Sequence, residues 1–193
     1  MTTAALLAAL SCGGTPEPTR AVQTAEAPGP ASSGTGAKVI GTLASSIAPP
    51  SSLVALEPQD GVDVPVRTEP ALMDQAGTEF IPGFLIAQAG QVVLFRNSED
   101  VIHNVRVTEV AEQKPVFNIA TPPFGKFEYR FERPGLYNVG CDIHSTMRAD
   151  ILITATPYTA TTGADGRFAI ANVNPGRYNL TIYAGSTPVV RSI

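Results

Sequence analysis

The sequence has few of the residues on which most metal enzymes and redox cofactors depend. Among its 193 residues there are two histidines, two cysteines and no tryptophan. Multicopper oxidases and copper nitrite reductases need many more histidines than two. A c-type haem needs a Cys-x-x-Cys-His segment, which cysteines at positions 12 and 141 cannot form. Neither a Gly-x-Ser-x-Gly elbow nor a glycine-rich phosphate loop is present, so we expect no enzyme.

Charge and long apolar runs are also scarce. Only 16% of the residues are charged and the formal net charge is −4, which argues against a nucleic-acid partner. No apolar run reaches the roughly 18 residues of a membrane-spanning helix. Apolar residues nevertheless make up 44% of the chain, in short runs interrupted by 17 glycines and 17 prolines. This pattern predicts an all-β sandwich with a buried core.

The N-terminus has the features of an export signal. The run Ala4 to Leu10 resembles a short secretory h-region, and Cys12 after it resembles the lipobox of bacterial lipoproteins. The alternatives are a plain cleaved signal and an ordinary apolar start. We expect residues 1–12 to direct export to the periplasm or cell surface, with lipid at Cys12 as the only membrane contact. The unpaired Cys141 would then need a reason to stay reduced in an oxidising compartment, and metal ligation is one.

Both histidines lie in segments with metal-ligand character. Cys141, His144 and Met147 form a Cys-x-x-His-x-x-Met sequence at the end of an expected strand, and His103 lies in the alternating run 101–107. One thiolate, two imidazoles and a distant thioether are the ligands of a mononuclear blue-copper centre. Zinc also accepts Cys and His but rarely recruits Met, so Met147 favours copper.

The alternation of apolar residues predicts which side chains point toward the core. One inward face has Val101, His103, Val105 and Val107, and a second has Tyr137, Val139 and Cys141. Taken alone, an inward His103 is more simply a core histidine with a satisfied hydrogen bond. A Cys141–His144 nucleophile pair is another alternative, although burial at a strand end suits a ligand better than an attacking thiolate.

The sequence resembles the cupredoxins, most nearly the plastocyanin and amicyanin group, over roughly residues 80–154. The residues that carry the resemblance are Asn97, His103, Asn104, Val105, Pro134, Gly135, Leu136, Tyr137, Cys141, His144, Met147 and Arg148. The resemblance implies a Greek-key β-sandwich that holds one copper ion, Cu(I)/Cu(II), through His103, Cys141 and His144, with Met147 as axial ligand. It also implies that Asn104 forms hydrogen bonds that keep the site rigid.

Two details qualify the resemblance. Many relatives have proline immediately before the second histidine, whereas this chain has Asp142 and Ile143, which predicts a less rigid loop and a shifted potential. The segments 73–75 and 80–82 resemble a bacterial subgroup of plastocyanin-like proteins often labelled methylamine-utilisation proteins. We infer no role in methylamine metabolism from that label.

The C-terminal segment resembles the carboxypeptidase-regulatory, transthyretin-like β-module. Asp165 and Gly166 are expected to form a hairpin turn that pairs the strand of Phe168 and Ile170 with the strand of Tyr178, Leu180 and Ile182. So short a module must lean on the copper domain, borrowing edge strands at 38–43 and 52–57. The predicted organisation is a signal or lipobox-like segment at 1–12, a disordered tether at 13–37, a cupredoxin-like copper domain at 38–155 and the β-module at 156–193. The strands within 38–57 are expected to be shared between the last two.

These features predict an exported blue-copper protein that carries single electrons between redox partners, one of them an unidentified redox protein. The alternatives are a copper- or zinc-binding or carrier protein without redox traffic, and an envelope interaction module.

Overall fold

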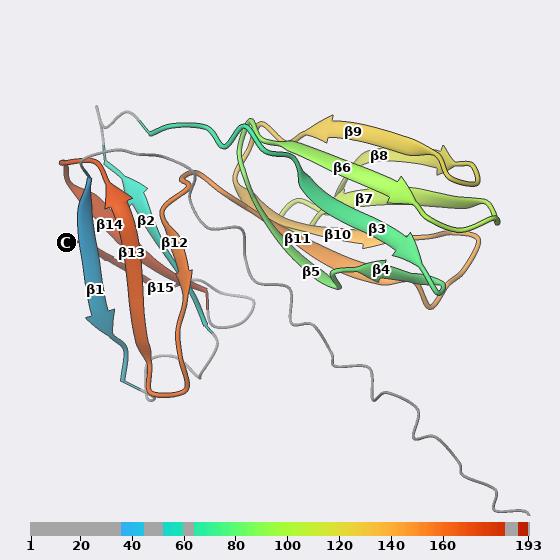
Figure 1. Cartoon of the computed structure of the whole chain (residues 1–193). Coiled ribbons are helices and arrows are strands. Elements are labelled where there is room, and N and C mark those ends of the chain that lie inside the picture. The colour runs from blue at the N-terminus through green and yellow to red at the C-terminus, as the bar shows by residue number, and fades with distance from the viewer. Residues whose placement is uncertain (1–35, 45–51, 60–63, 184–188, 193) are drawn as a thin grey trace, which may run out of the picture.

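A computed structural model of the chain describes residues 36–44, 52–59, 64–183 and 189–192. Every regular element in these residues is a β-strand, so the prediction of an all-β fold is confirmed (Figure 1). Among the described residues no helix is long and apolar enough to cross a membrane. Residues 1–35, with the expected signal, Cys12 and most of the expected tether, lie outside the described residues.

Nine consecutive strands form a two-sheet sandwich, which we call the large sandwich. They are β3 (Ala71–Ala76), β4 (Glu79–Ile81), β5 (Phe84–Gln88), β6 (Val92–Asn97), β7 (His103–Glu109), β8 (Lys114–Thr121), β9 (Lys126–Arg130), β10 (Gly135–Gly140) and β11 (Arg148–Thr154). One sheet has the order β4-β3-β6-β9 and the other β5-β11-β10-β7-β8. The β3/β6 and β5/β11 pairs are parallel, and the other neighbouring strands are antiparallel.

The core of the large sandwich lies between these two sheets. Strands of one sheet contribute Met73, Val93 and Phe95, and strands of the other contribute Val105, Val107, Val139 and Ile151. In β3 and β6 these positions alternate with exposed or partly exposed residues, as strands with one buried face require, whereas in β11 Leu152 beside Ile151 is also buried. The expected inward face of β7 is therefore present from His103 onward, but Val101 lies outside the strand and is 44% exposed.

The other six strands form what we call the small unit. They are β1 (Ala37–Thr42), β2 (Leu53–Pro58), β12 (Thr159–Thr161), β13 (Arg167–Val173), β14 (Tyr178–Tyr183) and β15 (Val189–Ser192). β1 pairs with β13, and a second sheet has the order β12-β2-β14-β15. The two N-terminal strands thus pair within the small unit. β2 is not an edge strand, since it lies between β12 and β14 with Val54, Ala55 and Leu56 fully buried.

The expected pairing of Phe168 and Ile170 with the strand of Tyr178 is wrong. Among the described strands, β13 pairs with β1, and β14 pairs with β2 and β15. Phe168, Ile170, Tyr178 and Ile182 instead belong to one buried cluster between the two sheets of the small unit. The chain crosses from one sheet to the other after Val173, so the two inward faces meet across the core.

Both parts of the chain use the same turn before a strand. Pro134-Gly135-Leu136-Tyr137 and Pro175-Gly176-Arg177-Tyr178 are each followed by asparagine. The Tyr137 hydroxyl donates a hydrogen bond to the Arg133 carbonyl, and the Tyr178 hydroxyl donates to the Asn174 carbonyl, each over 2.8 Å. This is the arrangement of a tyrosine corner, which fixes how the chain enters a sandwich strand.

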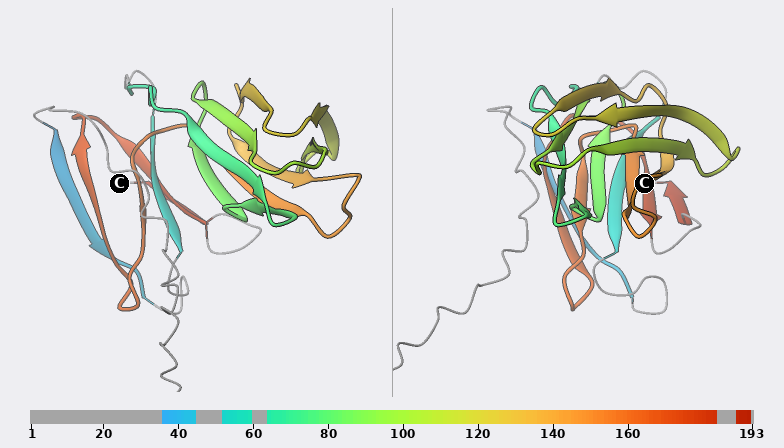
Figure 2. Two further views of the ribbon diagram at one scale, coloured as in Figure 1. Left: turned by 45° about the vertical axis from the view of Figure 1, so that its right-hand side comes forward. Right: turned by 90° about the vertical axis from the view of Figure 1, so that its right-hand side faces the viewer.

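Two connections join the large sandwich to the small unit. The two parts lie beside each other in Figure 1 and in the left view of Figure 2. In the first connection, the Arg67 amide donates to Gln88 Oε1 over 2.9 Å, and the Gln88 side chain donates to the Pro65 carbonyl. The Arg67 guanidinium reaches the second connection, where it donates to the Pro157 carbonyl over 2.7 Å. One arginine therefore holds both connections.

Candidate metal centre

The predicted ligands meet at one end of the large sandwich because of strand pairing. Cys141 directly follows β10 and Met147 directly precedes β11. These antiparallel strands are paired through Gly140 and Arg148, so residues 141–147 form the loop that joins them. β7 is the other neighbour of β10, and its first residue, His103, lies at the same end of the sheet.

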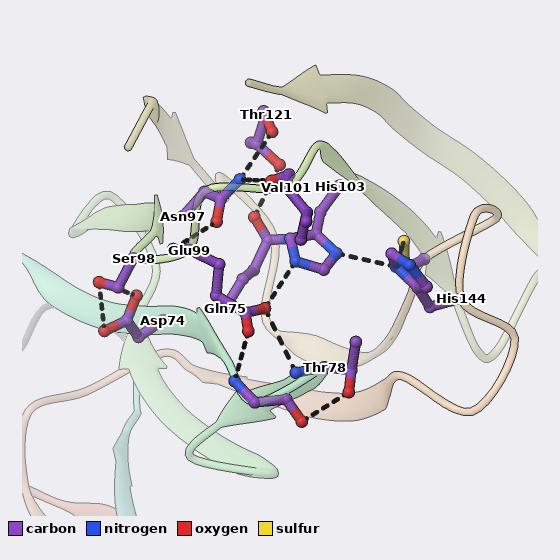
Figure 3. Close-up of polar contacts among 12 residues, drawn as sticks. Asp74, Gln75, Thr78, Asn97, Ser98, Glu99, Val101, His103, Thr121 and His144 are labelled. Carbon is purple, nitrogen blue, oxygen red and sulfur yellow. Dashed lines mark hydrogen bonds and ion pairs between the residues drawn. The ribbon is translucent and has the colours of Figure 1, made fainter. Parts of the chain in front are cut away.

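Three donor side chains converge there. Nδ1 of His103 lies 3.0 Å from Nδ1 of His144 (Figure 3). Sγ of Cys141 lies 3.9 Å from Nδ1 of His144. One donor atom from each residue can be chosen so that all three lie within 4.8 Å of one another. His103 and Cys141 are buried and His144 is partly exposed. A thiolate with two imidazoles at this separation fits a copper ion.

Met147, the fourth predicted residue, lies in the same loop. Its side chain is 1% exposed and belongs to the buried cluster that includes Cys141. Its amide donates to the His144 carbonyl over 3.0 Å, and its carbonyl accepts from the Cys141 amide over 3.2 Å. The loop backbone therefore holds Met147 near Cys141 and His144, the two predicted ligands that precede it, and its role as axial ligand stays a prediction.

Glu99 orients His103. Its Oε2 lies 2.7 Å from His103 Nε2, on the side of the ring opposite His144 (Figure 3). A hydrogen on Nε2 donated to this carboxylate leaves the Nδ1 lone pair free, as in the carboxylate–histidine pairs of metal sites. Partial burial raises the pKa of the Glu99 carboxyl, but hydrogen bonds from His103 and from the amides of Thr78 and Gly77 outweigh it and hold this pKa below its usual value.

The role of Glu99 was not predicted from the sequence, although its position four residues before His103 was a signal. The side chain of Asn97, which is 1% exposed, forms the hydrogen bonds that hold the loop between β6 and β7. Asn97 Oδ1 accepts from the Glu99 amide over 2.9 Å, and Asn97 Nδ2 donates to the Val101 carbonyl over 2.8 Å. This loop turns Glu99 toward His103 and leaves Val101 outside β7.

Asn104 forms hydrogen bonds to the ligand loop. Its Oδ1 accepts from the Asp142 amide over 2.7 Å and lies 3.2 Å from Cys141 Sγ. Its main-chain carbonyl accepts from the buried Gln75 side chain, whose Oε1 in turn accepts from the Thr121 hydroxyl over 2.6 Å. Residues from three strands thus hold the main chain next to His103.

Exposed apolar side chains adjoin the histidines in sequence. Ile102 precedes His103 and Ile143 precedes His144, and each is 51% exposed. Phe124, in the loop between β8 and β9, is also exposed, and its amide donates to the Glu99 carbonyl. The partly exposed His144 therefore lies in a loop at an end of the sandwich with apolar surface residues.

The solved structures similar to this chain are mainly cupredoxins, at low identity and over about half of its length. A purple cupredoxin from Nitrosopumilus maritimus is 21% identical with a TM-score of 0.39, over 44% of this chain and 99% of that one. A single-residue mutant of amicyanin, in the Cu(I) form, is 20% identical with a TM-score of 0.41, over 44% of this chain and 82% of that one. The copper-containing nitrite reductase of Thermus scotoductus SA-01 is 21% identical with a TM-score of 0.42, over 51% of this chain and 25% of the enzyme.

Sequence comparisons add one partial match. Residues 144–190 match the family described as polysaccharide lyase family 4, domain II. This region begins in the ligand loop and extends through β11 into the small unit. No curated protein sequence matches the chain significantly.

Proposed function

We propose that this protein is an exported blue-copper protein that carries single electrons between redox partners. The observation that carries the proposal is the convergence of His103, Cys141 and His144 in a chain with only two histidines. Both histidines contribute Nδ1 to the cluster, over 3.0 Å, and a buried cysteine completes it.

The donor set suits reversible one-electron chemistry. Copper held by His103, Cys141 and His144, with Met147 at a longer distance, would supply the Cu(I)/Cu(II) couple. The chain holds its own donors in place on both sides: Glu99 fixes the orientation of the His103 ring, and Asn104 holds the main chain after Cys141. Donors fixed in this way move little when the charge at the site changes.

We infer that the protein is not an enzyme. The four proposed ligands would leave no open position for a substrate, and His103 and Cys141 are buried. His144 is the most exposed of the three clustered donors, so electrons would enter and leave through its ring. The exposed Ile102 and Ile143, next to the proposed ligands in sequence, suit brief contact with another redox protein. The net charge of −4 does not suit binding to nucleic acid.

We also propose the location and organisation that the sequence predicts. Residues 1–12 would direct export, with lipid at Cys12, and residues 13–37 would tether the folded part to the membrane surface. The small unit would be a carboxypeptidase-regulatory-like β-module. Its match to a domain of polysaccharide lyases does not give it an activity. The resemblance to methylamine-utilisation-type proteins likewise leaves the pathway open.

The location is tested by fractionating a bacterial host that expresses the full chain. Wild-type protein should sediment with membranes, and Cys12→Ala should release it or block its processing. Unprocessed wild-type protein in the cytosol would contradict export.

Repeated redox cycling tests the proposed function. The copper-loaded protein should accept one electron per chain from ascorbate and donate it to ferricyanide over many cycles without releasing metal. Cys141→Ser should not complete such cycles. Protein that binds copper but releases it on reduction would instead be a metal carrier. Protein that prefers zinc and does not retain copper would contradict the proposal.

A further inference from the structure

Residues 141–147 form the loop that carries three of the proposed ligands. The side-chain carboxylate of Asp142 holds this loop. Asp142 directly follows Cys141, and Ile143 occupies the position where many relatives have proline. The missing proline predicted a less rigid loop. The structure has a network of hydrogen bonds around Asp142 instead.

Two neighbouring strands donate to the Asp142 carboxylate. Arg106 Nε, on β7, donates to Oδ1 over 2.7 Å. Asn118 Nδ2, on β8, donates to Oδ2 over 2.8 Å, and Asn104 Nδ2 lies 3.2 Å from the same oxygen. The Asp142 amide donates to Asn104 Oδ1 over 2.7 Å, so both the side chain and the main chain of Asp142 are held.

The strand pairing leaves room for this network. Arg106 lies opposite Gly140 in the β7/β10 pair. A Cβ atom at position 140 would come within 3.0 Å of Arg106 Nη2, which is closer than ordinary contacts. Glycine at position 140 therefore lets the guanidinium lie over β10 and reach the residue after Cys141.

We propose that Asp142 is a positioning residue that fixes the ligand loop to β7 and β8 through Arg106, Asn118 and Asn104, in place of a proline. The carboxylate couples the loop that carries Cys141, His144 and Met147 to the strand that carries His103. It therefore sets the separation of the donors before any metal arrives. The effect on a bound copper ion rests on the proposed function, whereas the effect on the loop does not.

The partial exposure of Arg106 and Asp142, 40% and 48% of their side chains, limits what this single ion pair contributes. The network is stronger than the pair because three side chains from two strands converge on one carboxylate.

The first measurement uses metal-free protein. Amide hydrogen exchange of residues 141–147 should become about tenfold faster in Asp142→Ala, because the loop opens locally without global unfolding. The matched control is Asp165→Ala, which removes an equal charge from the exposed Asp165–Arg167 pair of the small unit. Asp142→Asn keeps the size of the side chain and one acceptor oxygen, so its amide exchange rate should increase less than that of Asp142→Ala. Asn118→Ala removes only one of the donors and should also show a smaller increase in exchange rate.

The second measurement uses copper-loaded protein and separates positioning from charge. Asp142→Asn should raise the reduction potential and Arg106→Gln should lower it, since the oxidised site carries one more positive charge. The double variant should return the potential toward that of the wild type, while its visible spectrum stays altered because the loop remains loosened.

The outcomes distinguish the two claims. Exchange in the 141–147 loop that is the same in Asp142→Ala, Asp165→Ala and wild type would overturn the positioning role, whatever the metal does. If Asp142→Ala does not fold, the same comparison with Asp142→Asn and Arg106→Gln decides the question. A wild-type protein that fails to bind copper would overturn the proposed function but leave the exchange result valid.

Discussion

Nδ1 of His103 lies 3.0 Å from Nδ1 of His144, although the two residues are 41 positions apart in the chain. His103 Nε2 faces the Glu99 carboxylate over 2.7 Å and carries the hydrogen of that bond. The His103 Nδ1 atom is then an acceptor, and it needs either a hydrogen from His144 or a cation between the two rings. A metal bound between the rings would take the place of this shared hydrogen, which would move to Nε2 of His144.

Removing either of the two buried proposed ligands should abolish the proposed blue-copper site. Cys141→Ser exchanges the thiolate for a hydroxyl, and His103→Ala removes the imidazole that Glu99 orients, so both variants should lose the intense visible band of the copper-loaded protein. Cys12→Ala is the control, because it removes the other cysteine of the chain and should leave the spectrum unchanged. A retained band in Cys141→Ser would show that another residue supplies the charge-transfer ligand.

Met147→Leu should keep copper and raise the reduction potential, since a weak axial thioether affects the electronics of the site more than its affinity. The Met147 side chain is 1% exposed in a packed cluster, and a swap of similar volume should cost less than about 1.5 kcal/mol of folding free energy. Voltammetry and a copper titration measure the two quantities. If Met147→Leu loses copper as completely as Cys141→Ser, Met147 is a strong ligand and the proposed geometry is wrong.

Glu99→Gln should weaken copper binding by about 10- to 100-fold, as other losses of a carboxylate behind a histidine ligand do. The amide keeps an acceptor for His103 Nε2 but loses the charge, so the reduction potential should also rise. Asp100→Asn is the matched control, because it removes an equal charge from the adjacent, exposed residue. Competition titrations that give the same affinity for both variants would mean that Glu99 acts only through its charge.

The sequence predicted which donor side chains converge better than it predicted the residues that hold them in place. Alternation on an extended segment requires His103, Val105 and Val107 to share one face, and all three are fully buried. The role of Glu99 was not predictable from alternation, because Glu99 lies in a loop. Its position depends on the Asn97 side chain, which contacts segments distant in sequence, such as the Thr121 carbonyl.

The small unit illustrates the same limit. Phe168 and Ile170 alternate along β13, and both are buried. Alternation does not identify their neighbours, because a period of two defines the side of a strand and leaves its partner open. The partner of β13 is β1, more than 120 residues earlier, as in the pair Gly41–Phe168. Only long-range packing selects such a pair.

Asp74→Asn should lower stability at neutral pH and lose this effect in acid. Burial raises the pKa of Asp74, but hydrogen bonds from Arg96 and Ser98 outweigh it and hold the pKa below its ordinary value of 3.8. A carboxyl with a lowered pKa stabilises the fold fully above its ordinary pKa, and this contribution disappears as the pH falls through the lowered value. Solvent screens the partly exposed Arg96, so the effect should not exceed about 1 kcal/mol.

Urea denaturation between pH 2 and pH 7 measures this difference, with Asp165→Asn as the control in an exposed pair. The difference in free energy of unfolding between wild type and Asp74→Asn should be constant above about pH 5 and should become smaller below about pH 4. A gap that is the same at every pH would assign the effect to packing and not to the charge of Asp74.

The visible absorption spectrum of the oxidised, copper-loaded protein tests the central claim most directly. A trigonal site with a short bond from copper to Cys141 Sγ should give an intense thiolate-to-copper charge-transfer band at one copper per chain. Pale absorption from weak d–d transitions alone, with copper bound at one per chain, would contradict a blue-copper centre.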